Sequence, residues 1–163
     1  VWEGAMAASH YKLDNLCAVV DRNRLQISGG TEEVMAHDDL HERFNSFGWH
    51  VIDVADGNDV DQLHAAFEEA KTVKGKPTVL IANTVKGKGS PVMENKAGWH
   101  HKVPSDEEYA QICIDLAKAE EVALVNGARD TNDVARANCE ARANDVMKAN
   151  EAARMNANEE VFA

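Results

Sequence analysis

Three short runs of apolar residues recur along the first half of the chain, and amphipathic segments separate them. The runs cover residues 17–21, 50–55 and 78–83, are rich in β-branched side chains and are bounded by turn-forming residues. Such runs are typical of buried strands. The apolar spacing between them predicts helices at 38–47 and 59–72. Because strands and helices alternate, the pattern predicts an α/β fold with a parallel sheet and flanking helices.

Two of the predicted helices have additional sequence signals. A small-residue helix is expected over residues 4–16, before the first strand. The helix at 59–72 follows the turn Asp56-Gly57-Asn58, and four of its residues are spaced to face a core: Val60, Leu63, Phe67 and Ala70.

A further helix is predicted to begin at Ser105, directly after Pro104. The Ser105 hydroxyl can accept a hydrogen bond from the first turn, and the Glu108 carboxylate can accept one from the Ser105 N–H. This pair forms the capping-box arrangement. The residues expected to face a core are Tyr109, Ile112 and Leu116.

The composition changes at Asn126, after which Ala, Asn, Arg and acidic residues dominate. Asn recurs at every sixth position, a step of about 240° net around a helix, so these residues form no single stripe. Asn is also a weak helix former. We therefore predict one domain over residues 1–120 and an Ala/Asn-rich tail over 121–163 that is a long helix or a disordered extension.

Charge and cysteine content narrow the classes of partner and location. The 163 residues carry a formal net charge of −11, which argues against binding to nucleic acid or to an anionic membrane. No apolar run approaches the roughly 20 residues of a membrane helix. Cys17, Cys113 and Cys139 lack metal-ligand spacing, so we expect reduced thiols and a cytoplasmic protein.

Two loops that follow predicted strands carry residues suited to a phosphate or a metal. Asn23 can offer a side-chain carbonyl to a hard cation, and a backbone carbonyl two residues on can offer a second oxygen to Mg²⁺. The plain alternative for Asn23 is a turn residue. The Gly-rich basic loop at 86–89 can approach an anion closely, or it is an ordinary surface loop.

The order of motifs from Val1 to about Leu116 resembles the N-terminal, diphosphate-binding subunit of the split transketolases. The motifs that match are Asp21-Arg22-Asn23, Leu25-Gln26-Ile27-Ser28-Gly29, Phe47-Gly48-Trp49-His50, Asp56-Gly57-Asn58-Asp59, Lys74-Gly75-Lys76-Pro77-Thr78, Thr84-Val85-Lys86-Gly87-Lys88-Gly89-Ser90 and Gly98-Trp99-His100. The family's Gly-Asp-Gly motif would lie upstream of Val1. We therefore expect the chain to be truncated at its N-terminus.

The resemblance implies roles for six residues around thiamine diphosphate. Asn23 and the Leu25 backbone carbonyl would be Mg²⁺ ligands, with the upstream aspartate as a third. Ile27 would contact the thiazolium ring, although core packing is an equal alternative. Lys86 and Gly87 would border the cofactor. The catalytic candidate is His100, beside the diphosphate and the substrate channel, where an imidazole can move a proton; His101 replaces the family's usual Gly.

The implied reaction is the transfer of a two-carbon ketol unit from a ketose phosphate to an aldose phosphate. In the family the cofactor lies between this domain and a C-terminal, pyrimidine-binding subunit or domain, so we expect an oligomer and an inactive isolated chain. Without the upstream aspartate we expect weak or no cofactor binding. The alternatives are a deoxyxylulose-phosphate synthase, a non-catalytic interaction fragment and a dehydrogenase alpha subunit.

Overall fold

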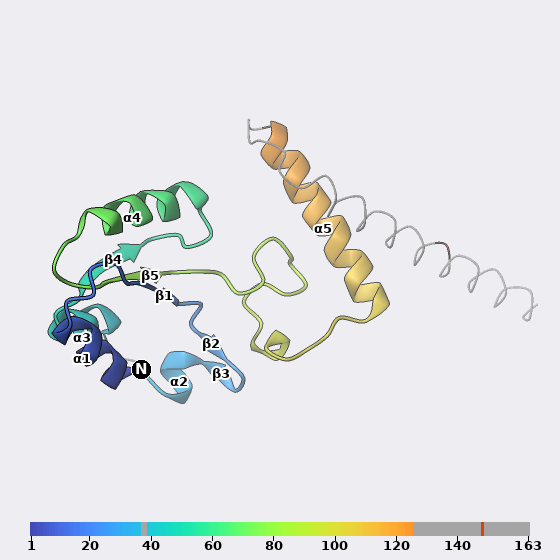
Figure 1. Ribbon diagram of the computed structural model, residues 1–163. Helices are drawn as coiled ribbons and strands as arrows, with labels where there is room; N and C mark the ends of the chain where they lie inside the picture. The colour runs from blue at the N-terminus through green and yellow to red at the C-terminus, as the bar shows by residue number, and fades with distance from the viewer. Residues whose placement is uncertain (37–38, 126–147, 149–163) are drawn as a thin grey trace, which may run out of the picture. The chain divides into compact units, whose positions relative to one another are not determined.

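The computed structural model describes residues 1–36, 39–125 and 148 of the chain (Figure 1). The described elements are α1 (Trp2–His10), β1 (Cys17–Asp21), β2 (Leu25–Gln26), β3 (Gly29–Gly30), α2 (Thr31–Val34), α3 (Leu40–Ser46), β4 (His50–Val54), α4 (Val60–Thr72), β5 (Thr78–Ala82), the 3-10 helix η1 (Ala97–Trp99) and α5 (Asp106–Val125). The three predicted strands and the helices at 38–47 and 59–72 are therefore confirmed, within two residues at each end. The first helix is shorter than predicted and ends at His10.

The chain divides into two compact units, which we name the sheet unit and the α5 unit. The sheet unit comprises residues 1–88 and 95–100, and the α5 unit comprises residues 89–94 and 101–163. Every residue of the predicted cofactor site belongs to the sheet unit. The predicted boundary near residue 120 stays a prediction.

The sheet unit is built on three parallel strands in the order β1-β5-β4. Asp21 pairs with Ala82, and Val54 pairs with Ala82 from the other side, so the carboxyl ends of the three strands are level. The parallel α/β fold predicted from the sequence is thus confirmed. The short strands β2 and β3 form a separate antiparallel pair in which Leu25 lies opposite Gly30.

Helix α4 covers one face of the sheet, and α1 and α3 lie on the other (Figure 1). Under α4 the buried residues are Ile52, Val54, Leu80 and Ala82 from the strands and Ala66 and Ala70 from the helix. The predicted stripe is partly wrong, because Val60 is 77% exposed and Phe67 is 41% exposed. The small Ala side chains let the helix approach the strands, and the face they define is rotated away from Val60 and Phe67.

Aromatic residues fill the opposite face of the sheet. Phe44 and Trp49 are buried with Val79, and the Trp49 indole Nε1 donates a hydrogen bond of 3.0 Å to the Ala5 carbonyl of α1. Trp2 stacks on Phe47 at a centroid distance of 5.7 Å. These contacts attach α1 and α3 to the strands.

The three strands differ in burial according to their position. All five residues of the central strand β5 are buried, as predicted. Among the described strands β1 and β4 are the two edges, and on β1 Cys17 is exposed and Val19 is 50% exposed, so the prediction of a fully buried strand is wrong for β1. An edge strand lacks a neighbour on one side, which leaves part of its surface uncovered.

The described part of the α5 unit confirms the predicted capping box. The Ser105 N–H donates to Glu108 Oε2 at 3.0 Å, and the Glu108 N–H donates to Ser105 Oγ at 3.3 Å. The buried face, however, centres on Ala110 and Cys113 with Tyr109 and Ile114, whereas Leu116 is 43% exposed.

The remaining expectations meet the structure only in part. The tail after Asn126 and Cys139 fall outside the described residues, apart from residue 148. Cys17 and Cys113 are free thiols, as expected. Within the part of the chain that is described, no helix has both the length and the apolar character to cross a membrane.

Candidate functional site

The loops after β1 and β5 start side by side at the carboxyl edge of the sheet. The strands are hydrogen-bonded neighbours, and just beyond their ends the Arg22 N–H donates to the Ala82 carbonyl at 2.8 Å. Asn23 lies on the first loop, and Lys86 and Gly87 lie on the second. Ligands of open parallel sheets bind outside the carboxyl ends of the strands. The topology therefore brings the two predicted ligand-binding loops to the expected edge.

Asn23 organises a tight turn directly after β1. Its Oδ1 accepts a hydrogen bond of 2.9 Å from the Leu25 N–H, which is the geometry of an Asx turn. Between them Arg24 adopts φ +61°, a left-handed conformation, and its carbonyl accepts from the Thr31 N–H at 2.9 Å. An amide oxygen has two lone pairs, so this turn uses only one of those on Asn23 Oδ1.

The donor atoms present fit part of a Mg²⁺ site. The Asn23 side-chain oxygen and the Leu25 backbone carbonyl are hard, neutral oxygens of the kind Mg²⁺ accepts. Across the residues the structure describes, no group of three or more His, Cys, Asp or Glu side chains is arranged to hold a metal. Two neutral oxygens make up only part of an octahedral Mg²⁺ site, and the diphosphate of a bound ligand could supply further oxygens and negative charge.

Ile27 is on the turn between β2 and β3 and is 61% exposed. This placement excludes the alternative that Ile27 packs in the core of the sheet unit. Ile27 is thus an exposed apolar residue two positions after Leu25.

Lys86 and Gly87 form the turn of the loop that follows β5. Gly87 has φ +70°, a conformation that is easy for glycine and strained for other residues. The Lys86 carbonyl accepts from the Asn95 N–H at 3.0 Å, and the Lys88 N–H donates to the Val85 carbonyl at 3.2 Å. Backbone hydrogen bonds therefore fix the conformation of this loop, and the loop carries the ammonium group of Lys86.

The predicted catalytic residue His100 is exposed and directly follows η1. The backbone N–H of His100 donates to the Ala97 carbonyl at 3.0 Å. The segment that carries it, residues 95–100, belongs to the sheet unit, and the Asn95–Lys86 hydrogen bond connects this segment to the basic loop. His101 is also exposed and belongs to the α5 unit.

Sequence reasoning missed the residues that support the basic loop. The Val85 N–H donates to Asn58 Oδ1 at 2.7 Å, and the Thr84 hydroxyl donates to Asp21 Oδ1. Asn58 comes from the loop after β4, and Asp21 ends β1, so the support comes from both neighbouring strands. The turn Asp56-Gly57-Asn58 at the end of a predicted strand was the available signal.

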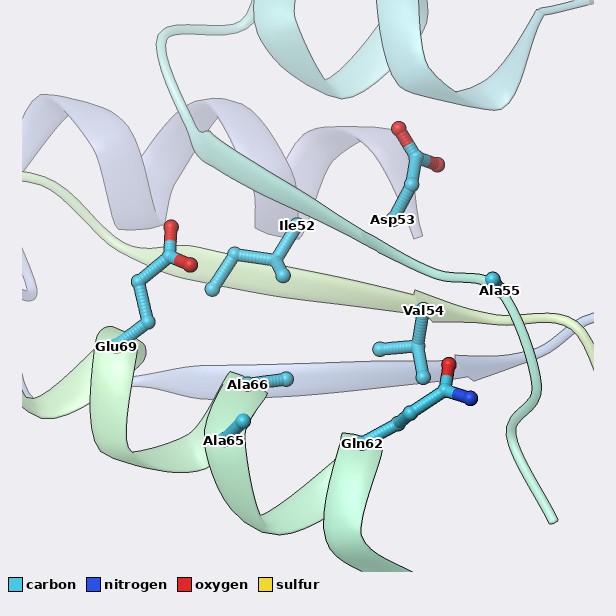
Figure 2. A pocket seen from close by; sticks show the side chains of 8 residues that line it. All are labelled: Ile52, Asp53, Val54, Ala55, Gln62, Ala65, Ala66 and Glu69. Carbon is cyan, nitrogen blue, oxygen red and sulfur yellow. The ribbon is translucent and has the colours of Figure 1, made fainter. Parts of the chain in front are cut away.

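Two cavities in the described part of the chain have linings without any predicted site residue. One of about 290 Å³ lies between β4 and α4, where Figure 2 shows Ile52 and Val54 pointing towards α4 and Asp53 pointing away. The other, of about 740 Å³, is mainly apolar and is lined by residues of α1, β1 and α3 that include Trp2, Val19 and Phe44.

Known proteins resemble most of the described chain. Residues 2–118 match the family described as transketolase, thiamine diphosphate binding domain. Over 121 residues the chain is 43% identical to an apulose-4-phosphate transketolase subunit of Phocaeicola vulgatus, covering 74% of this chain and 43% of that protein. A 6-deoxy-6-sulfo-D-fructose transketolase subunit of a Clostridium species is 37% identical over 118 residues, with coverages of 72% and 42%. The chain thus spans less than half the length of these relatives.

Solved structures agree with this assignment. A transketolase of Pichia stipitis in complex with sedoheptulose 7-phosphate superposes with a TM-score of 0.65 at 33% identity, covering 71% of this chain and 17% of that one. The transketolase of Leishmania mexicana gives a TM-score of 0.63 at 27% identity, covering 92% and 22%. The match in sequence, motif order and fold shows that the chain belongs to the transketolase family and carries its thiamine diphosphate binding domain.

Proposed function

We propose that this chain supplies the diphosphate-binding side of a transketolase active site. The observation that carries the proposal is the pairing of β1 with β5, which starts the Asn23 turn and the Lys86 loop side by side in a chain of this family. One loop has oxygens suited to a cation and the other has an ammonium group. Together they suit a magnesium diphosphate.

Each residue of the site would contribute one contact to the bound cofactor. Asn23 Oδ1 and the Leu25 carbonyl would hold Mg²⁺, the diphosphate supplying the negative charge that these neutral oxygens lack. Lys86 and the Gly87 backbone would approach the diphosphate, and the exposed Ile27 would cover the thiazolium ring. When bound, thiamine diphosphate supplies a nucleophilic carbon for cleavage next to a carbonyl.

His100 would act on the diphosphate or the sugar. An imidazole can donate a hydrogen bond to an anion or move a proton. Its exposed position on the segment hydrogen-bonded to the Lys86 loop supports this role.

The proposed overall reaction is transfer of a two-carbon ketol unit between sugar phosphates in a complex with a pyrimidine-binding subunit. Two relatives are named as transketolase subunits, which supports a partner chain and favours transketolase over the related thiamine diphosphate enzymes. Because these relatives are named as subunits, we propose that the chain needs a partner subunit for activity and is inactive alone. The free thiols support a cytoplasmic location.

Calorimetric titration of thiamine diphosphate with Mg²⁺ tests the proposal. It is performed on the chain alone and on the chain joined to an upstream Gly-Asp-Gly segment and mixed with the partner subunit. Binding is expected in the completed protein and is expected to be lost in Asn23→Ala, while Asn45→Ala on the exposed surface of α3 is the matched control. A completed protein that binds no cofactor, or binds it equally well without the Asn23 side chain, would contradict the proposal.

A further inference from the structure

The loop that carries Lys86 leaves the central strand of the sheet and is held from both sides. On the β4 side, Asn58 Oδ1 accepts from the Val85 N–H at 2.7 Å. On the β1 side, Asp21 Oδ1 accepts from the Thr84 hydroxyl. Two consecutive loop residues, immediately before Lys86, are therefore bound by a side chain from the loop after β4 and a side chain at the end of β1.

Asn58 is itself fixed in place by its own turn. Its N–H donates to Asp56 Oδ1 at 2.9 Å, and the neighbouring Gly57 N–H donates to the Asn83 carbonyl at 2.7 Å. The loop after β4 thus lies against the end of β5 and the loop that follows it, and one of the hydrogen bonds between them comes from the Asn58 side chain. An acceptor that is held in this way restricts the Val85 backbone more than a mobile side chain would.

We propose that Asn58 is a positioning residue for diphosphate binding, and that it acts by fixing the Val85 backbone so that Lys86 and Gly87 meet the anion without rearrangement. The proposal rests on the proposed function. Its physical basis is preorganisation, since a loop already held in its binding conformation loses less conformational freedom when the ligand binds. Asn58 also supplies its acceptor without a charge, whereas a carboxylate there would repel the diphosphate.

Two substitutions separate the hydrogen bond from the charge. Asn58→Ala removes the acceptor for the Val85 N–H, and Asn58→Asp keeps an acceptor and adds a negative charge. The matched control is Asn45→Ala, which removes an exposed Asn from α3. Each variant is made in the completed protein with its partner subunit. The two readouts are the Kd for thiamine diphosphate with Mg²⁺ and amide hydrogen exchange at residues 84–87.

The expected results differ between the variants. Asn58→Ala should weaken cofactor binding about fivefold and speed exchange at Val85 by a similar factor, which is the size expected for one hydrogen bond. Asn58→Asp should keep slow exchange at Val85 while it weakens binding through repulsion. Asn45→Ala should change neither quantity. If Asn58→Asp restores slow exchange at Val85, the faster exchange in Asn58→Ala comes from the lost hydrogen bond and not from a general loss of stability.

Other results would overturn the inference. Unchanged exchange at Val85 in Asn58→Ala, or exchange that speeds equally throughout β5, would show that Asn58 does not fix this loop. Faster exchange with an unchanged Kd would show that the fixed loop does not matter for the cofactor. If Asn58→Ala fails to fold, Thr84→Val removes the opposite contact to Asp21 and tests the same loop. A wild-type protein that binds no cofactor would instead reject the proposed function, and the cofactor role of Asn58 with it.

Discussion

Gly57 lies where the loop after β4 crosses the end of β5. A Cβ atom at this position would be 2.7 Å from Thr84 Cγ2 and 2.8 Å from Ala82 Cβ. Carbon atoms do not approach this closely in real proteins, so any larger residue must displace the end of β5 or the loop that follows it. The requirement for glycine comes from this close approach.

Gly57→Ala is therefore expected to lower the free energy of unfolding by about 1–3 kcal/mol, the usual cost of overpacking. Urea denaturation followed by tryptophan fluorescence measures the change. Gly4→Ala is the control, because a Cβ atom there meets nothing within 4 Å and Ala favours a helix. Equal stability of Gly57→Ala and wild type would show that the loops separate easily.

His41 of α3 forms a hydrogen bond with Asp53 of β4 through Nδ1 at 2.5 Å. The hydrogen bond to Asp53 raises the pKa of His41 above its ordinary value, and the charges of Asp53, Glu42 and Asp39 act in the same direction. A raised folded-state pKa stabilises the folded protein at pH values below the unfolded-state pKa. That contribution is lost as the pH rises through the folded-state pKa.

His41→Ala should consequently destabilise the protein more at about pH 5.5 than at about pH 8. The effect should be small, because the side chains of His41 and Asp53 are 41% and 53% exposed and water screens their interaction. Urea unfolding at the two pH values measures it, and Asp53→Asn should remove most of the difference. A larger loss at the alkaline pH would contradict the assigned direction.

At the scale of elements, the sequence predicted the strands and helices better than the helix faces. Short β-branched runs and capping residues are local signals, and they located β1, β4, β5 and the start of α5. The buried face of α4 depends instead on which residues let the helix approach the sheet, and Ala66 and Ala70 do so better than the larger Phe67. Likewise, the contact between Asn58 and Val85 joins loops 27 residues apart, so no local pattern contains it.

The capping box of α5 provides a test at this scale. Ser105→Ala removes the acceptor for the Glu108 N–H and should destabilise the first turn of the helix by about 1 kcal/mol. The measurement is amide exchange at Glu108, which should become faster. Ser105→Asp, which retains an N-cap acceptor, is the control and should restore most of the protection. Unchanged exchange in Ser105→Ala would show that the capping hydrogen bond contributes little.

At the scale of the whole molecule, the charge of the chain opposes its proposed ligand. The formal net charge is −11, and a diphosphate is itself anionic, so long-range electrostatics disfavour their association. At the Asn23 turn the oxygens offered to a cation are neutral, and the cationic side chains of the two loops are Arg22, Arg24, Lys86 and Lys88. A divalent cation between the protein and the diphosphate would offset the unfavourable net charge, so we expect it to strengthen binding.

Removal of Mg²⁺ with a chelator should thus weaken thiamine diphosphate binding to the completed protein by at least about tenfold, which corresponds to ~1.4 kcal/mol. Unphosphorylated thiamine provides the control, because its binding involves no diphosphate and should not respond to the chelator. Calorimetry in matched buffers measures both ligands. Chelator-insensitive binding of thiamine diphosphate would mean that Lys86 and backbone N–H groups suffice for the anion, and that Asn23 serves the turn rather than a metal.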